Sequence, residues 1–122
     1  MSTLKEYYDT QNVFAKILRN EIPCSKIYED EFTLAFHDIA PKAPVHALVI
    51  TKNPYISFAD FSKRAAPEEM VAVTKAIGVV AAKLGLKENG YRITSNIGHN
   101  SGQEVPHFHF HIMGGRPMGI IG

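Results

Sequence analysis

Three histidines near the C-terminal end of the chain alternate strictly with apolar residues. They are His107, His109 and His111, and they are followed in turn by Phe108, Phe110 and Ile112. Successive side chains of a strand point to opposite faces, so a strand here puts the imidazoles on one face and the apolar side chains on the core. A helix would scatter the imidazoles around its axis. The spacing therefore predicts a strand, which Gly114 and Gly115 bring to an end.

A row of three imidazoles is compatible with three kinds of site. A half-exposed strand with its polar residues outward is the plainest, but three histidines in register beside a Gly-rich loop make it the weakest. Histidines at i and i+2 can also chelate a metal ion, if His46 or Glu104 supplies a further ligand. The third is phosphoryl transfer with an imidazole nucleophile, because imidazole is largely unprotonated near neutral pH. The residue types alone do not separate the last two.

The composition is that of one ordinary globular domain spanning residues 1–122. Hydrophobic residues make up 45% of the 122 residues and charged residues 20%, and the net charge is +1 without a basic run. These values argue against a nucleic-acid partner, and no apolar run approaches the length of a membrane span. The lone Cys24 excludes an internal disulfide and, without a secretory signal at the N-terminus, predicts a cytoplasmic protein.

The elements that position the histidines can be predicted from periodicity and capping residues. Asn12 is suited to cap a short helix over residues 13–18, which Ile22-Pro23 stops. The clearest amphipathic helix begins at Pro67 and runs to Leu84, with Gly85 as its stop. Inside it, Gly78 is expected to mark close packing on the sheet. Residues 53–65 are expected to form a loop.

Alternating apolar residues and turn signals predict the strands that precede the histidine strand. These cover Ser25–Glu29, Phe32–His37, Val45–Lys52 and Tyr91–Asn96. The result is an α+β fold, an antiparallel sheet of about five strands with one long and one short helix. Residues 1–11 are predicted to be a flexible arm and residues 116–122 a short tail.

The segment Gly102–Gly115, GQEVPHFHFHIMGG, resembles the signature of the histidine triad (HIT) family. The trailing Gly-Gly-Arg-Pro resembles the Hint branch, the purine nucleoside phosphoramidases, and especially its bacterial members. The resemblance runs from about Val13 to Arg116. It implies a HIT-like fold and a homodimer with a continuous sheet. It also implies hydrolysis of purine nucleoside 5′-phosphoramidates and aminoacyl-adenylate-like compounds, with no cofactor and no metal.

The resemblance further implies a role for each site residue. His109 would attack phosphorus and form a covalent nucleotidyl-histidine, with His107 and His46 orienting it. His111 would hold the phosphate oxygens together with the segment from Gly102 to Val105. The residues implied to bind the nucleotide are Phe14, Ile17, Phe36, His37, Asp38, Ile39, Asn96, Gly102, Gln103, Glu104 and Val105. Among them, Asp38 would accept hydrogen bonds from both ribose hydroxyls.

Two residues depart from the family pattern. Glu104 stands where animal members carry Ser, and Pro106 stands where an aromatic residue is common. Proline has no N–H to donate to a sheet, so we expect an altered hydrogen bond just before His107. The alternatives to a phosphoramidase are a metal-dependent hydrolase that uses the three histidines, and a nucleotide-binding or scaffold protein without turnover.

Overall fold

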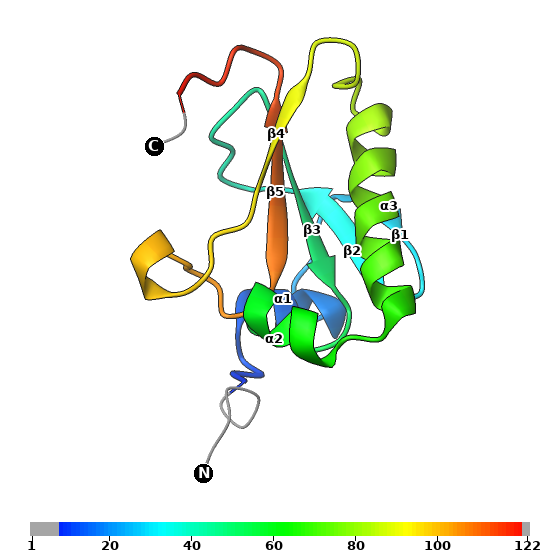
Figure 1. Ribbon diagram of the computed structural model, residues 1–122, viewed down its shortest axis with the longest axis vertical. Coiled ribbons are helices and arrows are strands. Elements are labelled where there is room, and N and C mark those ends of the chain that lie inside the picture. The colour runs from blue at the N-terminus through cyan, green and yellow to red at the C-terminus, as the bar shows by residue number, and fades with distance from the viewer. Residues whose placement is uncertain (1–7, 121–122) are drawn as a thin grey trace.

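Five antiparallel strands form a single sheet at the centre of the computed structural model, which describes residues 8–120 (Figure 1). They are β1 (Lys26–Glu29), β2 (Thr33–His37), β3 (Val45–Thr51), β4 (Tyr91–Thr94) and β5 (His109–Gly114). Their order across the sheet is β1-β2-β3-β5-β4, and every neighbouring pair is antiparallel. The predicted α+β fold is thereby confirmed, with β5, the strand of the histidines, between β3 and β4.

Within residues 8–120, three α-helices accompany the sheet, one more than the sequence predicted. They are α1 (Val13–Leu18), α2 (Phe58–Arg64) and α3 (Pro67–Lys83), and a short 3₁₀ turn, η2, covers His99–Ser101. The expectation of a loop over residues 53–65 is therefore wrong. The Ser57 side chain caps α2 by accepting the N–H of Asp60, and Asp60 pairs with Arg64 one turn later. Asn12 caps α1 as predicted.

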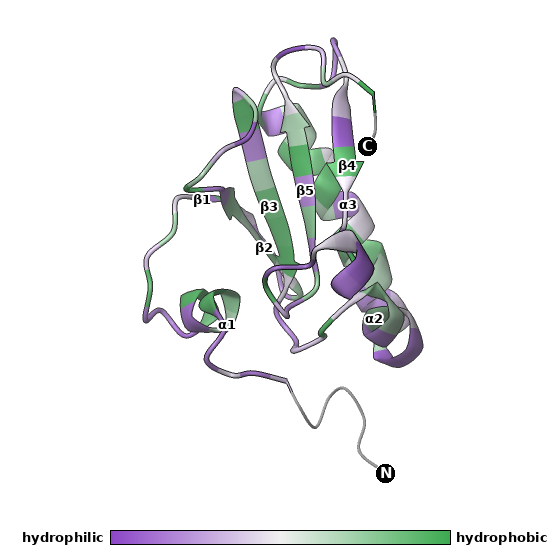
Figure 2. Ribbon diagram, turned by 90° about the vertical axis from the view of Figure 1, so that its left-hand side faces the viewer, coloured by the Kyte–Doolittle hydropathy of each residue, from purple (hydrophilic) through white to green (hydrophobic). Residues whose placement is uncertain are grey.

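The sheet carries α3 on one face and α1 on the other. In Figure 2 the strands β3, β5 and β4 pass in front of α3, whereas α1 lies clear of it. The alternation along β3 follows from this layering. Ala47 and Val49 pack in the cluster that includes α3, and Leu48 and Ile50 pack in the cluster that includes Phe14 of α1.

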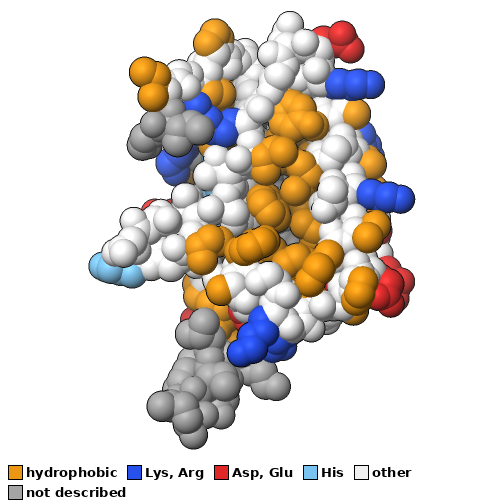
Figure 3. All heavy atoms as spheres, in the orientation of Figure 1, with side chains coloured by type: hydrophobic (Ala, Val, Ile, Leu, Met, Phe, Trp, Pro, Cys, Tyr) orange, Lys and Arg blue, Asp and Glu red, His pale blue; other side chains and the backbone are white. Residues whose placement is uncertain are grey.

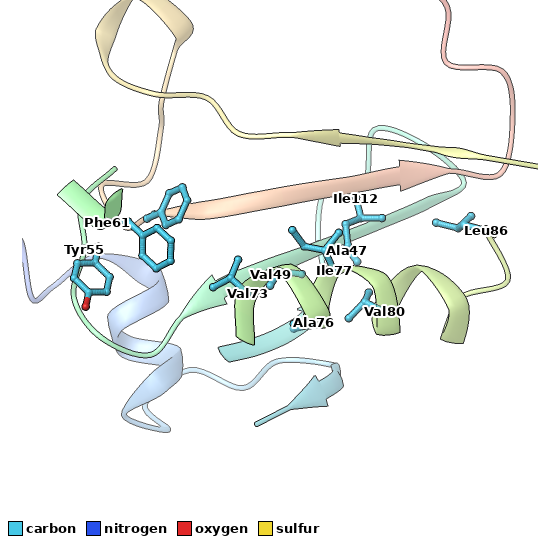
Figure 4. Close-up of a cluster of buried hydrophobic side chains, with 12 residues drawn as sticks. Ala47, Val49, Tyr55, Phe61, Val73, Ala76, Ile77, Val80, Leu86 and Ile112 are labelled. Atoms are coloured by element: carbon cyan, nitrogen blue, oxygen red, sulfur yellow. The ribbon is translucent and has the colours of Figure 1, made fainter. Parts of the chain in front are cut away.

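The core between α3 and the sheet is aliphatic along most of its length and aromatic at one end. Ala76 and Val80 of α3 are fully buried against Ala47 and Val49 of β3 and Ile112 of β5 (Figure 4). Phe108, just before β5, closes one end of this cluster with Phe61 of α2, the two ring centroids being 4.8 Å apart. The apolar residues of the histidine segment thus belong to the core, as predicted.

An exposed apolar surface lies over β4 and α3, on the face turned to the viewer in Figure 1. Figure 3 shows hydrophobic side chains gathered there. The large exposed apolar residues of these elements are Tyr91 and Ile93 of β4 and Val71 and Val79 of α3, and Ile93 is 48% exposed. Because β4 is also an edge of the sheet, this β4–α3 surface combines apolar side chains with unpaired backbone groups.

Two details differ from what the sequence predicted. A side chain at Gly78 would meet nothing within 4 Å, so this glycine does not mark close packing on the sheet. The last strand begins at His109 rather than His107, because Pro106 has no N–H and the N–H of His107 turns back to the Val105 carbonyl. The strand does end at Gly114, as predicted.

The two ends of the described chain are tied to the fold. Residues 1–7 of the predicted arm and 121–122 of the predicted tail lie outside the described residues. Asn12 donates to the carbonyl of Asp9 through both its backbone N–H and its side-chain amide. Arg116 donates to the Lys42 carbonyl at 3.3 Å. In the described part of the chain, no helix has the length and apolar character of a membrane span.

Candidate active site

One cavity, of about 450 Å³, collects nearly all residues that the sequence singled out. The predicted catalytic histidines that line it are His46, His109 and His111. The predicted nucleotide-binding residues that line it are Phe14, Ile17, Phe36, His37, Asp38, Ile39, Asn96, Gly102, Gln103, Glu104 and Val105. His107 alone does not. The fold thus brings residues from α1, β2, β3, β5 and the loop before β5 around one space.

The apolar end of the cavity is formed by α1 and the strands beneath it. Phe14 and Ile17 of α1 pack in one buried cluster with Phe36 of β2 and Leu48 of β3. The Phe14 ring stands edge-on to Phe36, at 5.7 Å, and to His109, at 5.0 Å between ring centroids. Phe14 therefore links the apolar end of the cavity to the imidazole at its polar end.

The ring of His109 is held in one tautomer by the backbone. Its Nδ1 lies 2.6 Å from the carbonyl oxygen of His107, and a carbonyl can only accept. Nδ1 therefore carries the hydrogen, and Nε2 keeps its lone pair in the neutral ring. Burial lowers the pKa of His109 below its usual value, against the opposing effect of the His107 carbonyl. The neutral ring with a free Nε2 is the form that can attack phosphorus.

His107 is buried behind the cavity and does not contact it. Its Nε2 lies 2.7 Å from the Thr51 carbonyl and its Nδ1 lies 2.5 Å from the Tyr8 hydroxyl. Burial lowers the pKa of His107 to about 4, so the ring is neutral near pH 7. The prediction that the strand includes His107 is wrong, because β5 begins at His109. What His107 offers to His109 is its backbone carbonyl, while its ring anchors the segment.

A second chain of hydrogen bonds fixes His46 and His111. The backbone N–H of Lys42 donates to Nδ1 of His46 at 3.0 Å, so the His46 hydrogen sits on Nε2. That Nε2 lies 2.9 Å from Nδ1 of His111, which accepts. Burial and the neighbouring His109 and His46 lower the pKa of His111 to about 4. In the neutral His111, the hydrogen is consequently on Nε2, where it can be donated to a ligand.

The group of side chains most suited to a metal ion among residues 8–120 consists of Asp38, His46 and His111. Ligand atoms of Asp38, His46 and His111 all lie within 4.8 Å of one another. However, a metal-bound histidine normally donates from its other nitrogen to a carbonyl or carboxylate. The other nitrogen of His46 instead accepts the N–H of Lys42, so it has no room for a hydrogen. The donor set fits a metal ion poorly, and the three motif histidines do not converge on one point.

Comparison with known proteins agrees with this arrangement. The HIT domain family matches residues 19–118. The chain belongs to the HIT family. It is 54% identical to a HIT-like protein of Azospirillum brasilense over 92% of both chains, and 39% identical to the purine nucleoside phosphoramidase of Escherichia coli over 89% of this chain and 91% of that one. A HIT family hydrolase structure from Legionella pneumophila, 38% identical, has a TM-score of 0.83 and covers 89% of this chain and 96% of that one.

The loop that leads into the HIT motif is braced by Gln103. Its side-chain oxygen accepts the N–H of Gly98 at 2.9 Å, and its amide nitrogen donates to the carbonyls of Ile56 and Val105. Within residues 8–120, no group accepts the backbone N–H of Glu104 or of Val105. These two free donors, at a cavity wall, are suited to anionic oxygens. The Glu104 side chain is exposed at the same wall.

The two carboxylate oxygens of Asp38 have different surroundings. One carboxylate oxygen accepts the N–H of Ala40 at 2.8 Å, the local turn expected of an Asp at a strand end. The other lies 3.4 Å from Nε2 of His46 and faces the cavity that Asp38 lines. The turn and the ligand-binding readings of this residue are therefore compatible.

Several residues that shape the HIT site were not found from the sequence. Lys42 and Thr51 act through backbone groups, which every residue type carries, so their side chains gave no signal. Tyr8 lies in the segment that was expected to be a flexible arm. Leu48 and Cys24 also line the cavity, and nothing in their type distinguished them from ordinary core residues.

Proposed function

We propose that this protein hydrolyses purine nucleoside 5′-phosphoramidates and aminoacyl-adenylate-like compounds through a nucleotidyl-histidine intermediate. Membership of the HIT family and the relative named purine nucleoside phosphoramidase support a nucleotide hydrolase. The solved relative named a HIT family hydrolase supports the same class. The cavity supports a nucleotide, because a flat base suits its apolar end and a phosphate suits its imidazoles and free N–H groups.

The observation that carries the proposal is the hydrogen bond from His109 Nδ1 to the His107 carbonyl, 2.6 Å long. It leaves Nε2 as the nucleophilic atom beside the cavity. Nε2 attacks phosphorus, a phosphorus–nitrogen bond to His109 forms, and the bond from phosphorus to the amine breaks. Water then attacks phosphorus, the bond to Nε2 breaks, and the nucleoside monophosphate leaves with His109 restored. The Nε2–H of His111 is placed to stabilise the phosphate oxygens in both steps.

The departing amine needs a proton, since an amide anion is a very poor leaving group. Glu104 is the acidic side chain at the wall nearest the motif, and its charge acts on His109. We assign to the Glu104 carboxyl the delivery of that proton to the nitrogen of the departing amine. The resulting carboxylate takes up the proton that the attacking water gives up in the second step. Ser in its place would offer a hydroxyl but no carboxylic acid, so substrate choice among amines would differ.

The proposal includes a homodimer built on the β4–α3 surface. Two copies of the edge strand β4 can pair across a twofold axis and continue the sheet, which covers both unpaired edges. The exposed side chains of Tyr91 and Ile93 support this, because an edge strand with apolar side chains otherwise invites aggregation. A cytoplasmic location, proposed from the free Cys24, suits nucleotide substrates.

The test is hydrolysis of adenosine 5′-phosphoramidate by the pure protein with and without EDTA. We expect AMP and ammonia to form at equal rates in both, because imidazoles and N–H donors suffice. Loss of activity in EDTA and its recovery with zinc would favour a metal-dependent hydrolase, for which the Asp38–His46–His111 trio is the candidate site. AMP binding without turnover would instead identify a nucleotide-binding protein.

A further inference from the structure

Tyr8 contacts the first histidine of the motif from 99 positions away along the chain. Its hydroxyl lies 2.5 Å from Nδ1 of His107, and the two rings meet at an angle of 66° with centroids 5.7 Å apart. Neither the apolar end of the cavity nor its phosphate end includes Tyr8. The contact therefore needs an explanation other than ligand binding.

The other ring nitrogen of His107 determines which group donates in this hydrogen bond. Nε2 faces the Thr51 carbonyl at 2.7 Å, so Nε2 carries the hydrogen and Nδ1 has only a lone pair. Tyr8 must then be the donor. The His107 side chain is completely buried, and without Tyr8 its Nδ1 would be a buried acceptor with no partner among the described residues. Tyr8 is thus what completes the hydrogen bonding of this ring.

The backbone of His107 in turn holds His109. The carbonyl of His107 is the acceptor for His109 Nδ1, but His107 lies before β5 and outside its ladder. Around this carbonyl the backbone is held by the His107 N–H to Val105 and by the Phe108 N–H to Tyr55. The ring of His107, held between Tyr8 and Thr51, is a further restraint on where that carbonyl points.

We propose that Tyr8 is a positioning residue for the nucleophile, acting through the ring and carbonyl of His107 on the tautomer and orientation of His109. The inference rests on the proposed function. Tyr8 itself is held at the start of α1, because Asn12 caps that helix and also donates to the carbonyl of Asp9. Since α1 supplies Phe14 to the apolar end of the cavity, the same segment sets both the binding wall and the nucleophile.

The experiment replaces Tyr8 by Phe, which removes the hydroxyl and keeps the ring. Tyr28→Phe is the matched control, because the Tyr28 hydroxyl bonds to Asp30 beside β1 and not to the site. For each protein, kcat and KM are measured with adenosine 5′-phosphoramidate, and AMP affinity is measured by titration. The ¹⁵N resonances of the histidine rings are recorded by NMR, which reports tautomer and hydrogen bonding without any turnover.

We expect Tyr8→Phe to lower kcat about tenfold, the size of one lost hydrogen bond at a buried group, with KM and AMP affinity within about twofold. The Nδ1 resonance of His107 should shift, and that of His111 should not. Tyr28→Phe should match the wild type. An unshifted His107 Nδ1, or an unchanged kcat in Tyr8→Phe, would overturn the inference. An inactive wild type would refute the proposed function instead, and the NMR result would still decide whether Tyr8 holds His107.

Discussion

The ring hydrogens of the motif histidines and of His46 are positioned by hydrogen bonds that begin at backbone groups. Each of these backbone groups can only accept or only donate. The carbonyl of Thr51 and the carbonyl of His107 can only accept, and the N–H of Lys42 can only donate. These three backbone groups fix the tautomers of His107, His109 and His46, and the hydrogen bond from His46 then fixes that of His111. One residue type therefore supplies a buried anchor and the residues proposed as nucleophile and phosphate donor, and burial lowers the pKa of all three rings.

Replacing His109 by Ala tests the nucleophile. We expect kcat to fall by at least about three orders of magnitude, because no other atom can form the covalent intermediate. AMP affinity should stay close to that of the wild type, since Phe14, Ile17 and Asp38 remain. His99→Ala, an exposed change on η2, is the control and should have full activity. Near-normal turnover, or a trapped nucleotide on a residue other than His109 by mass spectrometry, would contradict the assignment.

The pH dependence of kcat/KM tests the electrostatics of the same residue. Burial lowers the pKa of His109, so the neutral nucleophile should persist below pH 6.5 and activity should fall only at more acidic pH. The charge of Glu104 raises that pKa in part. Glu104→Gln should therefore move the acid limb to still lower pH, whatever its effect on the maximal rate. An acid limb above pH 6.5, or a shift of the limb to higher pH in the variant, would contradict this.

At the scale of elements, long periodic segments were predictable and short ones were not. The apolar stripe of α3 and the alternation along β3 came directly from the residue types, because many positions repeat the same pattern. Helix α2 has seven residues, less than two turns, so its apolar positions showed no period. The only signal was a serine three residues before an aspartate, Ser57 and Asp60, which is a capping pattern.

The residues of the site also differ in how far the sequence predicted them. Residues proposed to act through their side chains, such as His109 and Asp38, could be placed at the cavity from type, spacing and family resemblance. Residues that act through the backbone, such as Lys42, could not, because the N–H is common to nearly every residue. The position of His107 was mispredicted for a related reason. A strict alternation does not show where a ladder begins, and the proline before His107 decided that locally.

The junction between α2 and α3 depends on one buried carboxylate. Glu69 accepts hydrogen bonds from the Ala66 N–H, the Tyr55 hydroxyl and the Asn53 amide, so it caps α3 and holds the preceding loop. Burial opposes its charge, but these hydrogen bonds lower its pKa below the usual value. We expect Glu69→Ala to lower the free energy of unfolding by about 1–3 kcal/mol in urea. Glu68→Ala, on the exposed side of the same turn, should have little effect, and equal losses in both would contradict this role.

At the scale of the whole molecule, the proposed homodimer depends on the β4–α3 surface. We expect a dimer by light scattering at micromolar concentration, because the apolar edge strand is stable only when it is covered. Ile93→Lys places a charge in the proposed interface and should give a monomer. Ile39→Lys introduces the same charge at an isoleucine that is 96% exposed beside the cavity, and it should remain a dimer. A monomeric wild type, or a dimer in both variants, would exclude this surface.

Global stability should fall as the pH drops from 7 toward 4. His107 and His111 have a pKa of about 4 in the folded protein, against 6.5 in the unfolded chain. Between these values the unfolded chain binds more protons, so the free energy of unfolding decreases with falling pH. For the fully buried His107 the shift corresponds to on the order of 3 kcal/mol, and the contribution of the more accessible His111 is smaller. The carboxylates with lowered pKa values, such as Glu69, lose their contribution only below about pH 4.5.

Urea unfolding at pH 7, 6 and 5 therefore isolates the histidines from the carboxylates. His107→Gln removes the titrating ring and keeps a neutral polar side chain at the same buried position. Its unfolding free energy should be lower than that of the wild type at pH 7, because an amide cannot reproduce both the contact to Tyr8 and the contact to Thr51. Between pH 7 and 5, however, it should decline less steeply than the wild type. A wild-type slope of zero, or the same slope in both proteins, would show that His107 does not fold as a buried neutral ring.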